Sequence, residues 1–153
     1  MVDVEGVSSR LDRLSELLGE LDAIRAAGRD AYMTEPRTRL AAEHALQLAI
    51  QSCIDIGAHL ISELGLPTPS DYRGVFASLR SAGLDEPLTE RLAQAAGMRN
   101  ILVHGYLDVD DEAVWAALAD LDDLRSFAAS AQRIANADEQ DTSDEDADTE
   151  KPA

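Results

Sequence analysis

Residues Pro36 to Leu64 read PRTRLAAEHALQLAIQSCIDIGAHLISEL, and this stretch decides the fold. A helix that is apolar nearly all round must be buried on several sides. Pro36 suits the first turn of such a helix, and Gly65 suits its end. We therefore expect this helix at the centre of a bundle, in a homodimer interface, or both. Its large apolar residues are Leu40, Leu46, Leu48, Ile50, Ile54, Ile56, Leu60 and Ile61.

Apolar residues at helical spacing predict further amphipathic helices on both sides of this stretch. Aromatic residues make up only 4% of the chain and β-branched runs are scarce, which favours helices over a sheet. The fold class predicted is all-α, an antiparallel helical bundle of about five helices. The four additional helices are expected within residues 4–28, 71–83, 86–104 and 111–131.

The length of 153 residues allows one domain with a substantial core, which we place at residues 1–137. Residues 138–153 are rich in acids and contain no large apolar residue. Such a composition cannot bury enough apolar surface to fold. We therefore expect residues 138–153 to form a disordered acidic tail.

The formal net charge of −17 is divided between the two parts of the chain. The tail contributes −7 and the body −10, so the body is acidic as well. This counts against sequence-independent binding to duplex nucleic acid or to membranes, both of which need a basic face. Any contact with nucleic acid must then be confined to a local basic pocket.

The sequence also indicates where the protein works. It has no uninterrupted apolar run long enough to cross a membrane and no basic region at its N-terminus, so we expect neither a membrane span nor a secretory signal. Cys53 is the only cysteine and lies in the apolar helix. It is best interpreted as a small buried residue in a reduced cytoplasm.

One short stretch suggests chemistry: residues Arg99 to Tyr106 read RNILVHGY. Chance would place Arg-x4-His-x-Tyr in roughly 0.4% of chains of this composition. Histidine exchanges a proton near neutral pH, and arginine offers a fixed fork of donors to phosphate oxygens. Asn100 lies four residues before His104 on the same helix face, where its side chain could hold a phosphate oxygen or orient the imidazole. His104, Arg99 and Asn100 are therefore the candidate catalytic residues for cleaving RNA.

A structural interpretation of these residues stays open at this stage. His104 could simply complement the helix dipole, Arg99 could pair with a nearby acid, and Tyr106 could be a core aromatic. A metal centre is less well supported, because the three histidines are dispersed and no His-x3-His or Cys-x-x-Cys pair exists. No glycine-rich phosphate loop is present either. We expect no metal and no cofactor.

The octapeptide resembles the defining motif of the HepT-like branch of the HEPN superfamily. The order of the helices before it and the LPTPSDY loop of residues 66–72 also resemble this branch. The resemblance covers roughly residues 11–133. It matches the family motif Arg-x4-His-x-Tyr with Arg99, His104 and Tyr106, and the polar position after the arginine with Asn100.

The resemblance implies a homodimer in which two copies of the motif face a shared cleft and cleave RNA without a metal. It implies a toxin of a type VII HepT/MntA toxin–antitoxin system. The partner implied is an MntA-like nucleotidyltransferase antitoxin, which silences the toxin by AMPylation of the motif tyrosine, Tyr106. The added nucleotides would repel and obstruct RNA. To offset the acidic body, Arg99 would need support from other arginines such as Arg37 or Arg39.

Two other functions remain possible from the sequence. One is a non-catalytic HEPN binding module that partners a nucleotidyltransferase, with Tyr106 as the acceptor. The other is a purely structural helical dimer, which the chance estimate makes the weakest of the three.

Overall fold

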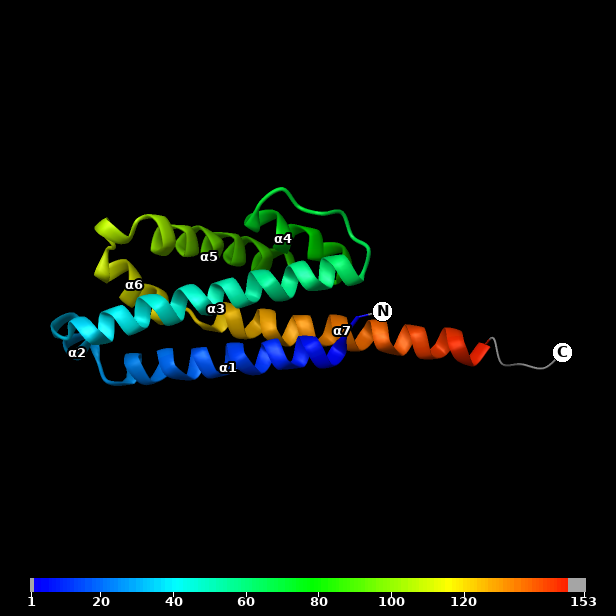
Figure 1. The fold of residues 1–153 in the computed structure, drawn as a ribbon, viewed down its shortest axis with the longest axis horizontal. Helices are drawn as coiled ribbons and strands as arrows, with labels where there is room; N and C mark the ends of the chain where they lie inside the picture. Colours follow the sequence, from blue (N-terminus) through cyan, green and yellow to red (C-terminus); the bar gives the residue numbers. More distant parts are fainter. Residues whose placement is uncertain (1, 149–153) are drawn as a thin grey trace.

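The computed structural model describes residues 2–148, and all regular secondary structure in this range is helical (Figure 1). The predicted all-α class is therefore confirmed. The helices are α1 (Val4–Ala26), α2 (Arg29–Thr34), α3 (Pro36–Glu63), α4 (Tyr72–Ser78), α5 (Glu86–His104), α6 (Asp111–Leu118) and α7 (Asp122–Asp148), with short 3-10 turns η1 (Leu79–Ala82) and η2 (Tyr106–Asp108).

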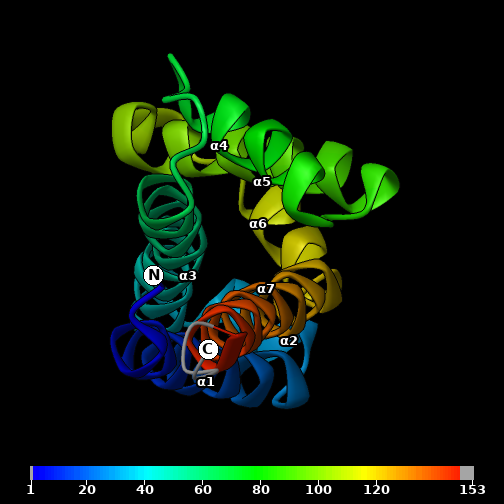
Figure 2. The same ribbon diagram turned by 90° about the vertical axis from the view of Figure 1, so that its right-hand side faces the viewer.

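Helix α3 packs against all six other α-helices of the described chain, and Figure 2 shows it along one side of the bundle, between α1 and the pair α4 and α5. These contacts confirm the burial on several sides expected from its sequence. Two of its large apolar residues are not fully buried: Leu40 is 65% exposed near the start of the helix, and Leu48 is partly buried. The buried residues of α3 are Ala42, Leu46, Ala49, Ile50, Cys53, Ile54, Ile56, Gly57, Leu60 and Ile61.

The length and apolar composition of α3 also satisfy the criteria for a membrane span. Its most apolar 18-residue window has a mean hydropathy of 1.2, and half of that window is buried inside the bundle. No other helix of residues 2–148 satisfies these criteria. Because α3 packs against all six other α-helices of the described chain, its contacts within the bundle account for this composition.

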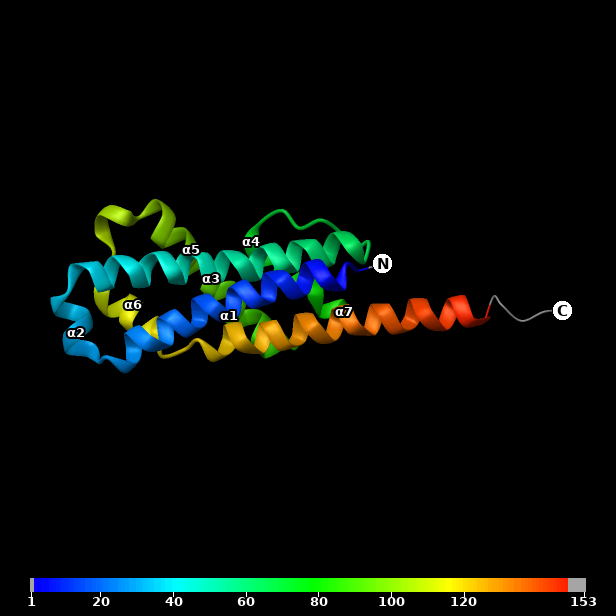
Figure 3. The ribbon, with the colours of Figure 1, turned by 60° about the horizontal axis from the view of Figure 1, so that its bottom comes forward.

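The long helices α1 and α7 run beside α3 and beside each other (Figures 1 and 3). Asp3 caps α1 by accepting a hydrogen bond from the backbone N–H of Gly6. The apolar stripe of α1 is buried at Val7, Leu14, Leu18 and Leu21. The apolar stripe of α1 therefore packs within the bundle.

Helices α4 and α5 cover α3 on the side away from α1 (Figure 2). The carboxylate of Asp71 caps α4 by accepting from Gly74 N at 2.7 Å, and that of Asp85 caps α5 by accepting from Leu88 N at 3.3 Å. Gly83 separates the two helices with a φ of 112°, which favours glycine. These two caps confirm the starts predicted for both helices.

Two details differ from the sequence-based expectation. Residues 29–34 form α2, because Gly28 at a φ of 98° turns the chain and the short helix buries Tyr32. The single helix predicted for residues 111–131 is two helices, α6 and α7, which are joined by residues 119–121. The acidic residues Asp122 and Asp123 lie in the first turn of α7, where they favour a new start.

The disordered tail predicted from Asp138 is not confirmed. Residues 138–148 continue α7 and project beyond the bundle (Figure 1), and 149–153 lie outside the described residues. No glycine or proline interrupts the chain between Asp122 and Asp148, so nothing in the sequence stops the helix. Asp138 also has a tertiary contact, because its carboxylate accepts a hydrogen bond from Val2 N at 2.7 Å.

Candidate active site at the end of α5

The motif residues lie on the last turns of α5 and on the turn that follows. Helix α5 ends at His104, and the N–H of Gly105 donates to the carbonyl of Ile101 at 2.7 Å. A Cβ on residue 105 would lie 2.9 Å from this carbonyl oxygen, so the position requires glycine. Its φ of −100° is accessible to any residue. The close approach to the Ile101 carbonyl, and not a left-handed conformation, therefore explains why glycine occupies position 105.

Arg99 is held in place by three neighbours. Its Nε–H donates to Oε1 of Gln51 at 2.7 Å, and its Nη1 donates to Oδ1 of Asn100 at 3.2 Å. The guanidinium carbon lies 5.0 Å from the centre of the Tyr72 ring. A guanidinium has five N–H donors, so three donors of Arg99 remain without a partner among the described residues.

The alternative in which Arg99 pairs with an acid is not supported. No carboxylate of residues 2–148 forms an ion pair with it. A partly buried guanidinium that is fixed by neutral groups keeps its positive charge available for an anion. This is the arrangement that a phosphate-binding arginine needs.

The other motif side chains lie at the surface. His104 and Asn100 are exposed, and they lie four residues apart on one face of α5. Tyr106 is 70% exposed, so the alternative that it is a core aromatic is wrong. Because Asn100 Oδ1 accepts from Arg99, its amide N–H groups are left to bind another acceptor. The described chain contains no hydrogen bond between His104 and either Arg99 or Tyr106.

The sequence did not predict how Arg99 is supported by α3 and α4. Gln51 Nε2 donates to Asp55 Oδ1 at 2.8 Å, so Asp55 orients the amide whose oxygen accepts from Arg99. These contacts join residues 48 positions apart, which helical periodicity does not reveal. A polar pair four residues apart within the most apolar part of α3 was the available signal. Tyr72 is the last residue of the LPTPSDY loop, which only the family resemblance had connected with the motif.

The arginines expected to support Arg99 behave differently. Arg39 is used within the fold: it donates to the carbonyl of Met33 at 2.6 Å and forms an ion pair with Asp111 at 3.5 Å. Arg37 is exposed and forms no ion pair within residues 2–148. Arg73 follows Tyr72 and is also exposed, and one of its terminal nitrogens approaches α5 at Gly97. Arg73 is therefore a better placed second cation than Arg39.

The remaining candidates for chemistry lie apart from the motif. In residues 2–148, no three His, Cys, Asp or Glu side chains are grouped so that they could hold a metal ion. His44 is exposed, and His59 Nε2 lies 3.9 Å from the carboxylate of Glu63. Cys53 is completely buried, as predicted, and burial raises the pKa of its thiol well above the usual range.

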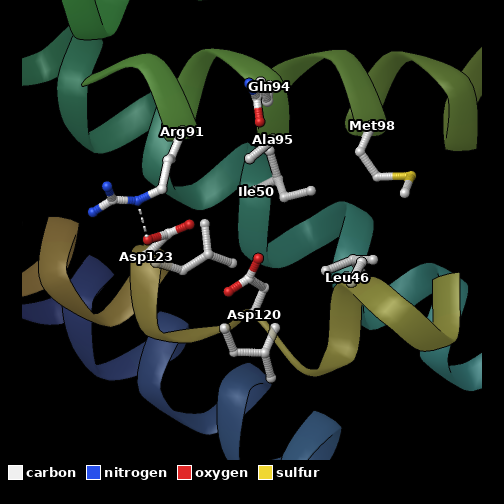
Figure 4. A pocket seen from close by; sticks show the side chains of 11 residues that line it. Leu46, Ile50, Arg91, Gln94, Ala95, Met98, Asp120 and Asp123 are labelled. Carbon is white, nitrogen blue, oxygen red and sulfur yellow. Dashed lines mark hydrogen bonds and ion pairs between the residues drawn. The ribbon is translucent and has the colours of Figure 1, made fainter. Parts of the chain in front are cut away.

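A separate cavity of about 180 Å³ lies between α3, α5 and the start of α7 (Figure 4). Leu46 and Ile50 of α3 line it together with Met98 of α5. At one side, Arg91 forms an ion pair with Asp123 at 2.7 Å. None of the motif residues lines this cavity, so it is not part of the candidate active site.

The fold and the motif define a helical bundle that holds a partly buried arginine beside an exposed histidine and an exposed tyrosine at the end of one helix. The family model for ribonuclease HepT-like proteins matches residues 11–131. The chain therefore belongs to the ribonuclease HepT-like family, as the sequence resemblance implied.

Similar proteins include two that are named as HepT nucleases. A tRNA nuclease HepT from Aphanizomenon flos-aquae is 30% identical over 122 residues, which cover 78% of this chain and 83% of the relative. An mRNA nuclease HepT from Shewanella oneidensis is 33% identical over 84 residues, which cover 54% and 63%.

Solved structures share the same fold. The tri-AMPylated HEPN toxin of Shewanella oneidensis, in complex with its MNT antitoxin, gives a TM-score of 0.75 at 23% identity, covering 85% of this chain and 97% of that one. YutE of Bacillus subtilis, a cytosolic protein of unknown function, gives a TM-score of 0.75 at 19% identity, covering 86% and 90%.

Proposed function

We propose that this chain is the ribonuclease toxin of a type VII HepT/MntA toxin–antitoxin system in the cytoplasm, and that it cleaves RNA without a metal ion. The proposal rests mainly on the environment of Arg99. Its guanidinium is held by Gln51, Asn100 and Tyr72, and three of its N–H donors have no partner within residues 2–148. The exposed His104 lies on the following turns of the same helix. Both relatives described as HepT are named nucleases.

The proposed reaction uses the 2′-hydroxyl of the RNA. His104 takes the proton from this hydroxyl, and the 2′-oxygen forms a bond to the adjacent phosphorus while the bond to the 5′-oxygen breaks. Arg99 stabilises the negative charge on the phosphorane, with Asn100 donating to a phosphate oxygen. The departing 5′-oxygen takes up a proton, so the products carry a 2′,3′-cyclic phosphate and a 5′-hydroxyl.

A homodimer would complete this site. A single Arg99 in a body of charge −10 is a weak phosphate site, whereas two copies facing one cleft double its local positive charge. Large apolar side chains are exposed around the motif, with Ile101 at 55%, Tyr106 at 70% and Leu107 at 82%. Such side chains favour a self-complementary contact between two copies. The histidine of the second copy would then donate the proton that the 5′-oxygen takes up.

Tyr106 is the proposed site of control by an MntA-like nucleotidyltransferase. Its phenol is accessible to a modifying enzyme. The phenol oxygen would attack the α-phosphorus of ATP and lose its proton while pyrophosphate leaves. The AMP added would place phosphate charge and bulk beside the motif, where it competes with RNA. The solved toxin of Shewanella oneidensis is AMPylated and bound to its antitoxin, which supports this assignment.

The nuclease is tested with purified protein and total RNA. Arg99→Ala and His104→Ala should each lower cleavage by on the order of 10²-fold or more, because each removes one element of the transition state. EDTA should have no effect, and light scattering should give the mass of two chains. Arg13→Ala is a matched control that removes an exposed arginine on α1, outside the motif. Full activity in both motif variants, or its loss in EDTA, would contradict the proposed chemistry.

The control mechanism is tested with Tyr106→Phe, which keeps the ring and removes the acceptor oxygen. The wild-type protein incubated with its nucleotidyltransferase and ATP should gain AMP in its mass spectrum and lose activity in step. The variant should gain none and should keep whatever activity it has. AMP on another residue, or inhibition without AMP, would show that the antitoxin acts differently.

A non-catalytic binding module is the second candidate, and the exposure of Tyr106 is the observation that favours it. A binding module would also accept AMP at Tyr106, so AMPylation does not distinguish it from the toxin. It would not cleave RNA in any state, so the nuclease assay separates the two functions.

A further inference from the structure

A hollow of about 490 Å³ lies between the C-terminal half of α3 and the loop that leads into α4. We refer to it as the α3–α4 pocket. Gln51 and Tyr72 both line it, and these are two of the three residues that hold the Arg99 side chain. The α3–α4 pocket therefore adjoins the proposed phosphate site directly.

The lining of the α3–α4 pocket suits a flat, uncharged group with polar edges. Ile54 and Val75 provide an apolar surface, and Pro69 and the partly exposed ring of Tyr72 provide flat faces for stacking. No lysine or arginine is among the described residues that line it. A phosphate would be repelled here, whereas a nucleobase would be accommodated beside a phosphate bound at Arg99.

Asp55 gives this pocket a way to distinguish bases. Its Oδ1 accepts from Gln51 Nε2, which leaves Oδ2 without a partner among the described residues. The other carboxylate in the lining, Asp71, caps α4 through its Oδ1, whereas Asp55 is the one linked to Arg99 through Gln51. A carboxylate oxygen accepts a hydrogen bond from an exocyclic amino group, as on cytosine, and repels the carbonyl that uracil has at the same position.

We infer that the α3–α4 pocket is a nucleobase subsite that binds a base with an exocyclic amino group next to the phosphate that is cleaved, with Tyr72 stacking on the base and Asp55 accepting from its amino group. This inference rests on the proposed function, because the occupant is part of the RNA substrate. It adds a base preference that the motif alone does not supply.

The preference is measured with short oligouridylates that contain a single internal cytidine, compared with oligouridylate itself. The wild-type protein should cleave beside the cytidine with a kcat/KM about tenfold above that for uridine. Asp55→Asn should reverse this preference. The oxygen of the amide introduced by this substitution is needed to accept from Gln51, so the amide N–H groups face the pocket and donate to the uracil carbonyl. Asp12→Asn, an exposed position on α1, removes the same charge and should change nothing.

A second variant fills the pocket without touching Arg99. Ala58 lies on the exposed side of α3 and lines the pocket, so Ala58→Trp should exclude the base. In this variant, the ratio of kcat/KM beside cytidine to kcat/KM beside uridine should fall to near one, while RNA is still cleaved. Direct binding to a His104→Ala protein, measured by fluorescence anisotropy with the same two oligonucleotides, reports the base preference without requiring turnover.

The possible outcomes distinguish a failure of the proposed base subsite from a failure of the proposed ribonuclease activity. Equal cleavage of both oligonucleotides by the wild-type protein would overturn the subsite. If Asp55→Asn lowered kcat/KM equally for both oligonucleotides, the subsite would also be overturned, because Asp55 would then act only through Gln51 and Arg99. Cytidine-selective binding, together with no RNA cleavage by the wild-type protein, would support the subsite and contradict the proposed function.

Discussion

Gln51 determines the direction in which the guanidinium of Arg99 points. Its Oε1 accepts from Arg99 Nε at 2.7 Å, and Asp55 fixes the orientation of the amide. Gln51→Leu should therefore lower kcat for RNA cleavage about tenfold, the usual effect of losing one hydrogen bond to a charged group. KM should change little, since the charge of Arg99 remains.

The matched control is Gln47→Leu, one turn earlier on α3, where the side chain makes no hydrogen bond within residues 2–148. Steady-state kinetics on one RNA substrate separate kcat from KM. An equal loss of kcat in both variants would mean that the change reflects α3 stability and not the position of Arg99.

At the scale of residues, the sequence predicted the motif but not its support. Arg99, Asn100, His104 and Tyr106 lie within eight positions, so their spacing on one helix end could be deduced from the 3.6-residue period. Gln51 and Tyr72 reach Arg99 from other helices, and only tertiary packing brings them there. The supporting role expected for Arg39 stays a prediction, and its Nη1 and Nε already contact backbone carbonyls and Asp111. The catalytic roles of the motif residues stay predictions.

At the scale of elements, the packing of α3 on α4 depends on Gly57. A Cβ at this position would lie 2.6 Å from Cγ1 of Val75 and 3.4 Å from Cδ1 of Leu79. Gly57→Ala should therefore destabilise the fold by about 1–3 kcal/mol through overpacking. Gly19→Ala on α1 is the matched control, because a Cβ there meets nothing within 4 Å. This control should stabilise the protein by about 0.5–1 kcal/mol.

Urea denaturation followed by circular dichroism measures both changes. If Gly57→Ala were as stable as the wild type, the close approach of α3 and α4 would not limit the side chain at position 57. Val75, which the added methyl would displace, also lines the α3–α4 pocket, so this variant should alter the base preference as well.

Long helices were predicted better than short ones. The bounds of α3 and α5 follow from a continuous apolar pattern, a capping aspartate or proline, and a terminal glycine. Helix α2 has only six residues, too few to show a period. The break between α6 and α7 interrupts an apolar pattern that continues through it, with Leu118 and Leu121 both buried. The acids Asp122 and Asp123 at the start of α7 mark the break, but the apolar pattern does not reveal it.

At the scale of the whole molecule, the charge of the chain is distributed unevenly along its length. The C-terminal turns of α7 are rich in acids and project from one end of the bundle, whereas the motif lies toward the opposite end (Figure 1). At physiological ionic strength, charges separated by more than about 8 Å are largely screened. The acids of α7 should therefore contribute little to RNA binding by the same chain.

This leads to a prediction for a truncated protein that ends at Ala137. The fold should survive, because the last buried residues of α7 are Ile134 and Ala135. At physiological salt, its KM for RNA should stay within about twofold of the full-length value, whereas at about 0.01 M salt, where the screening length is about 30 Å, KM should fall. Arg73→Gln should raise KM under both conditions, since Arg73 lies beside Tyr72 and α5. Steady-state kinetics at the two salt concentrations test both variants. A large gain in activity at physiological salt on truncation would show that the acidic end of α7 reaches a cleft, which in a dimer would be that of the second copy.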